Sequence, residues 1–183
     1  MLDKRMLRRQ ALENLRQLTT KQRAALMLQL PKAVARLEKW KLSQVVALPV
    51  SQAFEIPTNL LIQIALQQHK TVVVPRVKTK TMMEFIAITP ETIYSKSKFG
   101  ILEPVEGTVI APNAIDFFVV PGLFFSADGQ RIGFGGGYYD RYLERSLGYR
   151  LGVTIELNWK LKADWDVEVT DQGMDQVIKL APE

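Results

Sequence analysis

The chain has no cysteine and a single histidine among its 183 residues. The lack of cysteine excludes disulfide bonds, a thiolate nucleophile, Cys-ligated zinc and iron–sulfur clusters. A site with several histidine ligands is excluded too, and a Ser-His-Asp triad would depend on His69 alone. His69 follows two glutamines, a context that predicts the polar end of a helix and a structural or surface role. Any catalysis is therefore expected to use carboxylates, lysines, arginines and a bound cofactor.

Long hydrophobic runs are also lacking. The most apolar run, residues 117–125, is interrupted by Pro121 and Gly122 and is far shorter than the roughly 20 residues that span a bilayer. The N-terminus is basic at Lys4 and Arg5, with no apolar signal core behind it. We expect a cytoplasmic protein that does not associate with membranes.

Length and composition are those of an ordinary globular protein. With 47% hydrophobic and 23% charged residues, the chain is expected to form one domain over residues 1–183. Lysine and arginine number 24 against 19 acidic residues, a net charge of +5 that favours anionic ligands such as nucleotides, phosphates or nucleic acid.

The hydrophobic pattern changes along the chain from helical to strand-like. Helices are predicted over residues 3–18, 20–38, 58–69 and 137–147, and strands over 45–48, 71–74, 85–88, 115–120 and 151–155. Pro31 is expected to kink or split the second helix. Thr58 is a candidate N-cap and Gly148 a candidate residue just past a helix C-terminus.

Several predicted strands are apolar throughout and do not alternate, as in residues 72–74 and 117–120. Such runs are typical of a sheet that is buried on both faces by helices. An Asp128-Gly129 turn between apolar segments predicts an antiparallel hairpin that makes this sheet mixed. The expected fold is therefore a single three-layer α/β/α domain with a mostly parallel, mixed central sheet, similar to a Rossmann fold.

The densest motif is a glycine-rich segment that leads into a predicted helix. It reads Arg131-Ile132-Gly133-Phe134-Gly135-Gly136-Gly137-Tyr138-Tyr139-Asp140-Arg141. Glycines let backbone N–H groups approach an anion, and the helix N-terminus adds to the attraction. The segment matches neither the Walker A nor the Gly-x-Gly-x-x-Gly pattern. A phosphate-binding loop and a tight turn that requires positive φ both remain open.

Charged residues near this segment add candidates. Asp140 falls in the first turn of the predicted helix, where a carboxylate either favours the helix dipole or holds Mg²⁺. Near the N-terminus, Leu7, Ala11, Leu15 and Leu18 form an apolar stripe at helical spacing. Lys4 and Arg8 project close to that stripe. Such residues either extend past the apolar surface to solvent or neutralise a polyphosphate.

A third candidate region surrounds Glu55. The carboxylate lies between Phe54 and Ile56, just before a predicted helix. It would suit a planar ligand rich in N–H groups, such as a pterin, or be simply solvated. The run from Met82 to Phe85 fits core packing or a ligand wall.

Taken together, these motifs resemble the 5-formyltetrahydrofolate cyclo-ligase (5,10-methenyltetrahydrofolate synthetase) family. The resemblance rests on the glycine-rich segment and on weaker motifs in matching order: residues 4–8, 54–58, 83–85, 99–104 and 121–125. It implies an ATP- and Mg²⁺-dependent conversion of 5-formyltetrahydrofolate, with or without a polyglutamate tail, to 5,10-methenyltetrahydrofolate, with release of ADP and phosphate. The implied route is phosphorylation of the formyl oxygen by ATP, followed by attack of N10.

The resemblance also implies roles for individual residues. Lys4, Arg8 and Arg131 would act in catalysis, and Asp140 and Asp166 would hold Mg²⁺. Folate would contact Val50, Phe54, Glu55 and Met83. ATP would contact Lys4, Arg5, Met6, Leu7, Arg8, Arg131, Ile132, Gly133, Phe134, Gly135, Gly136, Gly137, Tyr138 and Tyr139. The protein would act as a monomer and bind no nucleic acid.

Near the C-terminus the chain departs from the family pattern. The usual His-Asp pair and Thr-Glu ending are missing, so Asp164 and Asp171 compete with Asp166 as the second Mg²⁺ ligand. The main alternative function is another ATP-dependent ligase or transferase on the same fold with a non-folate ligand. A basic RNA-binding module and an inactive folate-binding protein are further alternatives.

Overall fold

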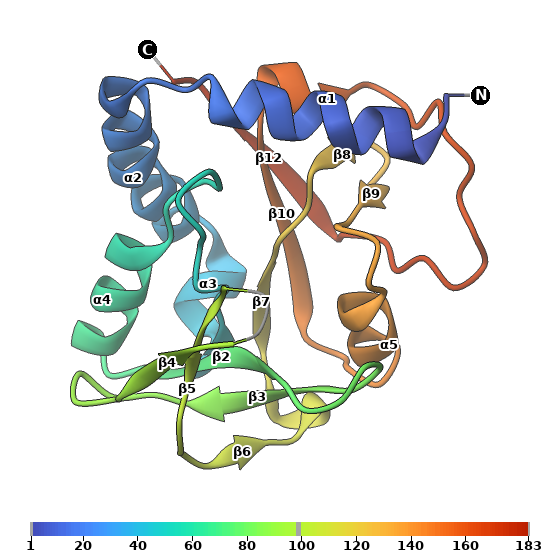
Figure 1. The fold of residues 1–183 in the computed structure, drawn as a ribbon. Coiled ribbons are helices and arrows are strands. Elements are labelled where there is room, and N and C mark those ends of the chain that lie inside the picture. The colour runs from blue at the N-terminus through green and yellow to red at the C-terminus, as the bar shows by residue number, and fades with distance from the viewer. Residues whose placement is uncertain (1, 98–99, 183) are drawn as a thin grey trace.

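The computed structural model describes residues 2–97 and 100–182. Within these residues, the centre is a seven-stranded sheet that is mostly parallel (Figure 1). Its strands are β1 (Val45–Ala47), β2 (Thr71–Val77), β3 (Met83–Ala87), β6 (Val109–Ile110), β7 (Phe117–Val120), β10 (Tyr149–Ile155) and β12 (Gln176–Leu180). The order is β12-β10-β7-β1-β2-β3-β6, and β3 pairs antiparallel with both β2 and β6. The expected mixed sheet is confirmed.

The sheet is buried on both faces because successive side chains of each strand point to opposite sides. Val46 and Val72 belong to one hydrophobic core, whereas Ala47 and Val73 belong to the other. All four residues of β7 are buried. This accounts for the continuous apolar runs in the sequence.

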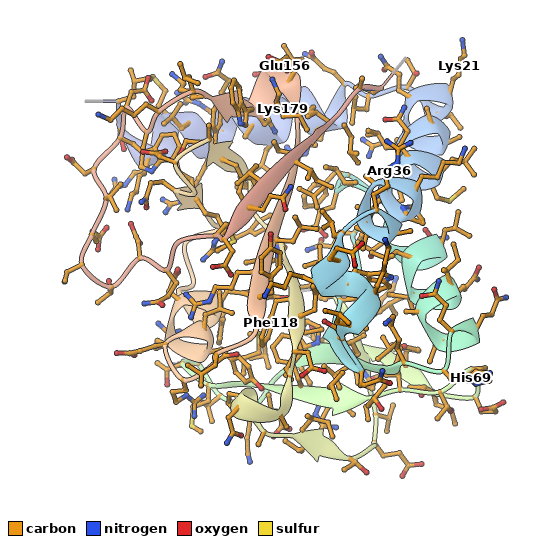
Figure 2. All side chains as sticks on the ribbon, turned by 180° about the vertical axis from the view of Figure 1, so that it is seen from behind. Lys21, Arg36, His69, Phe118, Glu156 and Lys179 are labelled. Carbon is orange, nitrogen blue, oxygen red and sulfur yellow. The ribbon has the colours of Figure 1, made fainter. Side chains whose placement is uncertain are left out.

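Helices cover the two faces unequally. They are α1 (Lys4–Arg16), α2 (Thr20–Ala35), α3 (Glu38–Leu42), α4 (Asn59–Gln67) and α5 (Tyr138–Leu143). Helices α2, α3 and α4 lie on one face, α5 lies on the other, and α1 crosses one end of the sheet (Figures 1 and 2). The three-layer architecture is thus confirmed. In the described part of the chain, no helix is long and apolar enough to cross a membrane.

The first two helices begin as capping chemistry predicts. Asp3 accepts a hydrogen bond from Arg5 N, and Thr19 and Gln22 form a capping box at α2. Of the kink or split expected at Pro31, the split is wrong: α2 continues through Pro31 to Ala35. Proline removes one helical hydrogen bond, and burial of Leu26, Leu30 and Val34 on the same helix supports continuity there.

The predicted hairpin exists but belongs to a different sheet. Strands β8 (Phe124–Ser126) and β9 (Arg131–Ile132) pair antiparallel, with Gly129 at φ 83° in the turn. β8 also pairs with β11 (Trp159–Lys160), and β4 (Tyr94–Lys96) pairs with β5 (Leu102–Pro104). The central sheet is therefore mixed because of β3, and the hairpin does not contribute to it. The described residues also form two short 3₁₀ helices, η1 (Pro112–Ala114) and η2 (Glu156–Asn158).

Two helix ends differ from expectation. Thr58 is the N-cap residue of α4, but its hydroxyl donates to the Pro49 carbonyl oxygen at 2.6 Å and does not cap the helix. Helix α5 ends at Leu143, so Gly148 is not its capping residue. A Cβ at Gly148 would lie 2.3 Å from the Ile115 carbonyl oxygen, so close packing requires glycine there. His69 is exposed at the outer end of α4, as predicted (Figure 2).

Candidate active site

A cleft of about 1010 Å³ lies beyond the carboxyl ends of β1 and β7. Pro49 and Val50 follow β1 and Pro121 follows β7, and all three line the cleft. The chain passes from β1 to β2 on one side and later adds β7 on the other side of β1. Such a reversal of strand order is where open α/β sheets bind ligands.

The cationic end of the cleft is formed by helix α1. Lys4 and Arg8 both line it because residues four apart share one helix face. Lys4 Nζ lies 2.8 Å from Asp171 Oδ2 and 3.1 Å from Glu168 Oε1. Burial lowers the pKa of Lys4, but these hydrogen bonds and charges outweigh burial and raise it overall. Lys4 is therefore a cation that carboxylates hold at the cleft.

The glycine-rich segment forms the wall beside Arg8. Gly135 and Gly137 have φ values of 99° and 65°, which glycine adopts most readily. Arg8 Nε donates to the Gly133 carbonyl oxygen at 2.9 Å. A Cβ at Gly135 would lie 3.6 Å from the Arg8 guanidinium carbon. The turn and the basic residue thus adjoin, and α1 meets a segment more than a hundred residues away in sequence.

The buried Arg131 forms an ion pair with the partly exposed Asp140 in the lining of the cleft. Arg131 Nη2 lies 2.6 Å from Asp140 Oδ1, and Arg131 Nη1 donates to the Pro121 carbonyl oxygen at 3.1 Å. The Gln172 N–H also donates to Asp140 Oδ1, at 3.1 Å. The Arg131 side chain is only 4% exposed. Both contacts to Asp140 use Oδ1, so the carboxylate is held in a fixed orientation at the cleft.

The other end of the cleft is less basic and more apolar. Val50 and Met83 line it together with Glu55, whose Oε2 accepts a hydrogen bond from Gln52 N at 2.6 Å. Burial raises the pKa of Glu55, and that hydrogen bond partly offsets the increase. Tyr139, the second residue of α5, also lines the cleft. This end combines one carboxylate with apolar walls, as a pterin-like ring requires.

The structure separates the three carboxylates considered as a second metal ligand. Asp166 is exposed and does not line the cleft, and Asp164 pairs with Lys160. Asp171 lines the cleft beside Asp140's hydrogen-bonding partner Gln172. Within the described residues no group of three or more acidic or histidine side chains gathers as a complete metal site. Mg²⁺ commonly needs only one or two carboxylates when substrate phosphates supply further oxygens, so this donor set fits it.

Most of the remaining expected site residues line the cleft. They are Arg131, Ile132, Gly133, Phe134, Gly135, Gly136, Gly137, Tyr138, Tyr139 and Asp140. Four others do not line it. Arg5 and Met6 are exposed and Leu7 is in the core, because helical rotation turns them away from Lys4 and Arg8. Phe54 lies outside the lining, with its ring centroid 6.4 Å from that of Phe134.

Several lining residues had no role assigned from the sequence, and two regions illustrate why. One is Glu103, in a motif that begins at Phe99, which lies outside the described residues. The other is the segment 168–172, where the sequence pointed only to Asp171 and which joins the cleft mainly through Lys4 and Asp140. This segment has no helix or strand and no glycine-rich pattern, so only a three-dimensional contact marks it.

Known structures share this fold. The 5,10-methenyltetrahydrofolate synthetase of Aquifex aeolicus matches with a TM-score of 0.85 and 29% identity, over 98% of this chain and 90% of that one. The enzyme of the same name from Mycoplasma pneumoniae matches with a TM-score of 0.78 and 26% identity, over 97% and 98% of the two chains.

Sequence relatives agree with the structures. A mouse 5-formyltetrahydrofolate cyclo-ligase is 29% identical over 96% of this chain and 92% of the mouse protein. A protein of that name from Haemophilus influenzae is 37% identical over 54% of this chain and 55% of its own length. The model of the 5-formyltetrahydrofolate cyclo-ligase family matches residues 1–178. The chain belongs to the 5-formyltetrahydrofolate cyclo-ligase family.

Proposed function

We propose that this ligase, which converts 5-formyltetrahydrofolate to 5,10-methenyltetrahydrofolate, uses ATP and Mg²⁺ in the cleft described above. One observation carries the proposal. A single cleft joins the basic pair Lys4 and Arg8, the glycine-rich segment and Asp140 to an apolar end that carries Glu55. A polyphosphate suits the first end, and a flat ring with N–H donors suits the second.

In this proposal the phosphates of ATP lie between α1 and the glycine-rich segment. Lys4 and Arg8 neutralise them, and backbone N–H groups of residues 133–137 add hydrogen bonds. Arg131 is already engaged by Asp140 and the Pro121 carbonyl, so it acts mainly by orienting that carboxylate. Lys4 exchanges its contacts with Glu168 and Asp171 for phosphate oxygens.

Mg²⁺ is proposed to bind Asp140, with Asp171 as the second carboxylate in place of Asp166. Support comes from the cleft lining, which includes Asp171 and leaves Asp166 outside. When bound, the ion would offset the charge of the transferring phosphoryl group and of ADP. Arg131 and the Gln172 N–H would hold Asp140 Oδ1, leaving Oδ2 for the ion.

The folate is proposed to place its pterin ring beside Glu55, between Val50 and Met83. Its formyl oxygen then attacks the γ-phosphorus of ATP, and N10 closes the ring as phosphate leaves. The substrate supplies both nucleophiles, so the chain mainly positions reactants and neutralises charge. Phe54 lies outside the cleft lining, with its ring tilted 57° to that of Phe134 and its centroid 5.7 Å from the Arg16 guanidinium carbon.

The direct test is to mix the protein with 5-formyltetrahydrofolate, Mg²⁺ and ATP and to follow the absorbance of methenyltetrahydrofolate. We expect product only when both ATP and Mg²⁺ are present, with one ADP released per product. A folded protein that forms no product but still hydrolyses or binds ATP would favour the same fold acting on a non-folate ligand. Product formation without ATP would contradict the proposal.

Three remaining expectations belong to the same proposal: one functional domain over residues 1–183, a monomeric state and a cytoplasmic location. The cleft supports the first, since it draws residues from α1 at one end of the chain and from 168–172 near the other. Light scattering coupled to size-exclusion chromatography measures the mass against the 20.8 kDa of one chain.

A further inference from the structure

The hydroxyl of Tyr139 is buried and has no hydrogen-bonding partner among the described residues. Buried tyrosine hydroxyls usually have one, because an unpaired donor forfeits its bond to water. The next tyrosine on the same helix follows the rule: Tyr142 Oη donates to the Ile110 carbonyl oxygen at 3.3 Å. Tyr139 therefore carries a buried donor without an acceptor, and the residue lines the cleft.

Its surroundings place this donor between the two ends of the cleft. Tyr139 directly precedes Asp140 in the cleft wall, and its ring neighbour Phe85 lies two residues from Met83 on β3. A tyrosine phenol has an ordinary pKa of about 10, so it carries its proton at neutral pH. The ring packs edge to face against Phe85, with centroids 6.1 Å apart, which fixes its position.

The proposed reaction requires an acceptor at this junction. If the pterin lies at Glu55 and the phosphates lie beside Lys4 and Arg8, the atom that joins them is the formyl oxygen. That oxygen is also the acceptor that a neutral phenol at the junction can satisfy.

Resting on the function proposed above, we propose that the Tyr139 hydroxyl donates a hydrogen bond to the formyl oxygen of the substrate. The oxygen forms a bond to the γ-phosphorus, the bond from that phosphorus to ADP breaks, and ADP takes the electron pair. N10 then bonds to the formyl carbon and loses its proton to solvent, while the carbon–oxygen bond breaks and phosphate leaves with the pair. Negative charge grows on the hydrogen-bonded oxygen in this last step, so the donor stabilises phosphate departure.

The test compares Tyr139→Phe with Tyr142→Phe, two identical deletions on one helix. Tyr139→Phe removes an unpaired hydroxyl, so its melting temperature should equal or exceed that of the wild type. Its rate of methenyltetrahydrofolate formation should fall roughly 100-fold while its affinity for ATP is unchanged. Tyr142→Phe should show the reverse pattern, a lower melting temperature with a normal rate.

Rapid quenching locates the affected step. In Tyr139→Phe, ADP should appear in a fast burst of about one equivalent, with the methenyl chromophore lagging behind it. A normal rate, a loss of ATP affinity, or equal slowing of ADP and chromophore would each overturn the inference.

Experiments can distinguish an error in the role of Tyr139 from an error in the proposed function. If the wild type forms no chromophore, the function is wrong, and binding of 5-formyltetrahydrofolate without ATP then tests Tyr139. Roughly fivefold weaker binding by Tyr139→Phe would support a bond from the hydroxyl to this ligand. Equal binding would overturn it.

Discussion

At the scale of single residues, buried charges organise the cleft. Arg131 is nearly inaccessible to solvent, and its charge is balanced by Asp140 at 2.6 Å. A buried cation that loses its partner is costly, so the pair acts as a unit. Asp140 consequently serves both stability and the proposed Mg²⁺ site.

We expect Asp140→Asn to lower turnover at least about 100-fold and the free energy of unfolding by about 1–3 kcal/mol. The amide keeps one acceptor oxygen for Arg131 but loses the charge that balances Arg131 and would hold Mg²⁺. Chromophore assays across a Mg²⁺ titration and urea denaturation measure the two effects. Asp128→Asn, an exposed turn substitution, is the control and should change neither. Wild-type turnover in Asp140→Asn would remove Asp140 from the proposed site.

The buried carboxyl group of Glu55 should make the free energy of unfolding depend on pH. Its folded pKa is raised by burial, so the folded state binds the proton more tightly than the unfolded chain. Its stabilising contribution is complete below the unfolded pKa of about 4.3 and is lost as pH rises through the folded pKa. Glu55→Gln should therefore be more stable than the wild type at pH 7, with the difference shrinking toward pH 4. Urea denaturation at both values measures this, and a constant difference would contradict the raised pKa.

At the scale of elements, glycine decides where segments approach closely. The region before β10 (Tyr149–Ile155) packs against the start of β7 (Phe117–Val120), and Gly148 leaves no space for a side chain there. Its missing Cβ would meet both the Ile115 carbonyl oxygen and, at 2.8 Å, the Phe118 ring. The chain spacing at the start of these two inner strands thus depends on one residue.

Gly148→Ala should reduce the free energy of unfolding by about 1–3 kcal/mol, since backbone has to move to accept the methyl group. Gly173→Ala is the matched control, because its nearest neighbour is the Gly129 oxygen at 3.8 Å. That variant should stay within about 0.5 kcal/mol of the wild type. Thermal and urea unfolding measure the stability of both variants. Equal losses of stability would show that crowding at Gly148 does not cause the destabilisation.

At the scale of the whole molecule, the cleft ties the two ends of the chain together. Lys4 lies near the N-terminus and reaches Glu168 and Asp171 near the C-terminus. Leu2 also pairs with Trp165. A ligand that bridges this cleft binds only when both ends are folded.

ATP with Mg²⁺ at 100 times its dissociation constant should therefore stabilise the protein by about 2.7 kcal/mol. For a chain of this length, that raises the melting temperature by about 5–11 °C. Lys4→Ala should reduce the shift at the same ATP concentration, because a phosphate-binding cation is lost. Differential scanning fluorimetry measures it, and an equal shift in Lys4→Ala would exclude Lys4 from the ATP site.

Much of this molecule follows from local sequence patterns. Apolar runs predicted the buried strands, helical spacing brought Lys4 and Arg8 onto one face, and the glycines of 133–137 indicated a special turn. These features depend on residues that are close together in sequence. The conformational preference of each residue and the period of the helix or strand fix how such residues are placed. The family motifs, matched in order along the chain, supplied the expected function.

Other features depend on contacts between distant segments. Pairing of β8 with β11 put the predicted hairpin in a second sheet, and the segment 168–172 brought Asp171, and not Asp166, to the cleft. Asp166 and Asp171 are chemically identical, and burial and partners differ only after the chain has folded. Local sequence therefore determined the strands, helices and phosphate-type motifs, whereas tertiary structure decided which carboxylates and hydroxyls meet, because packing sets distances between residues remote in sequence.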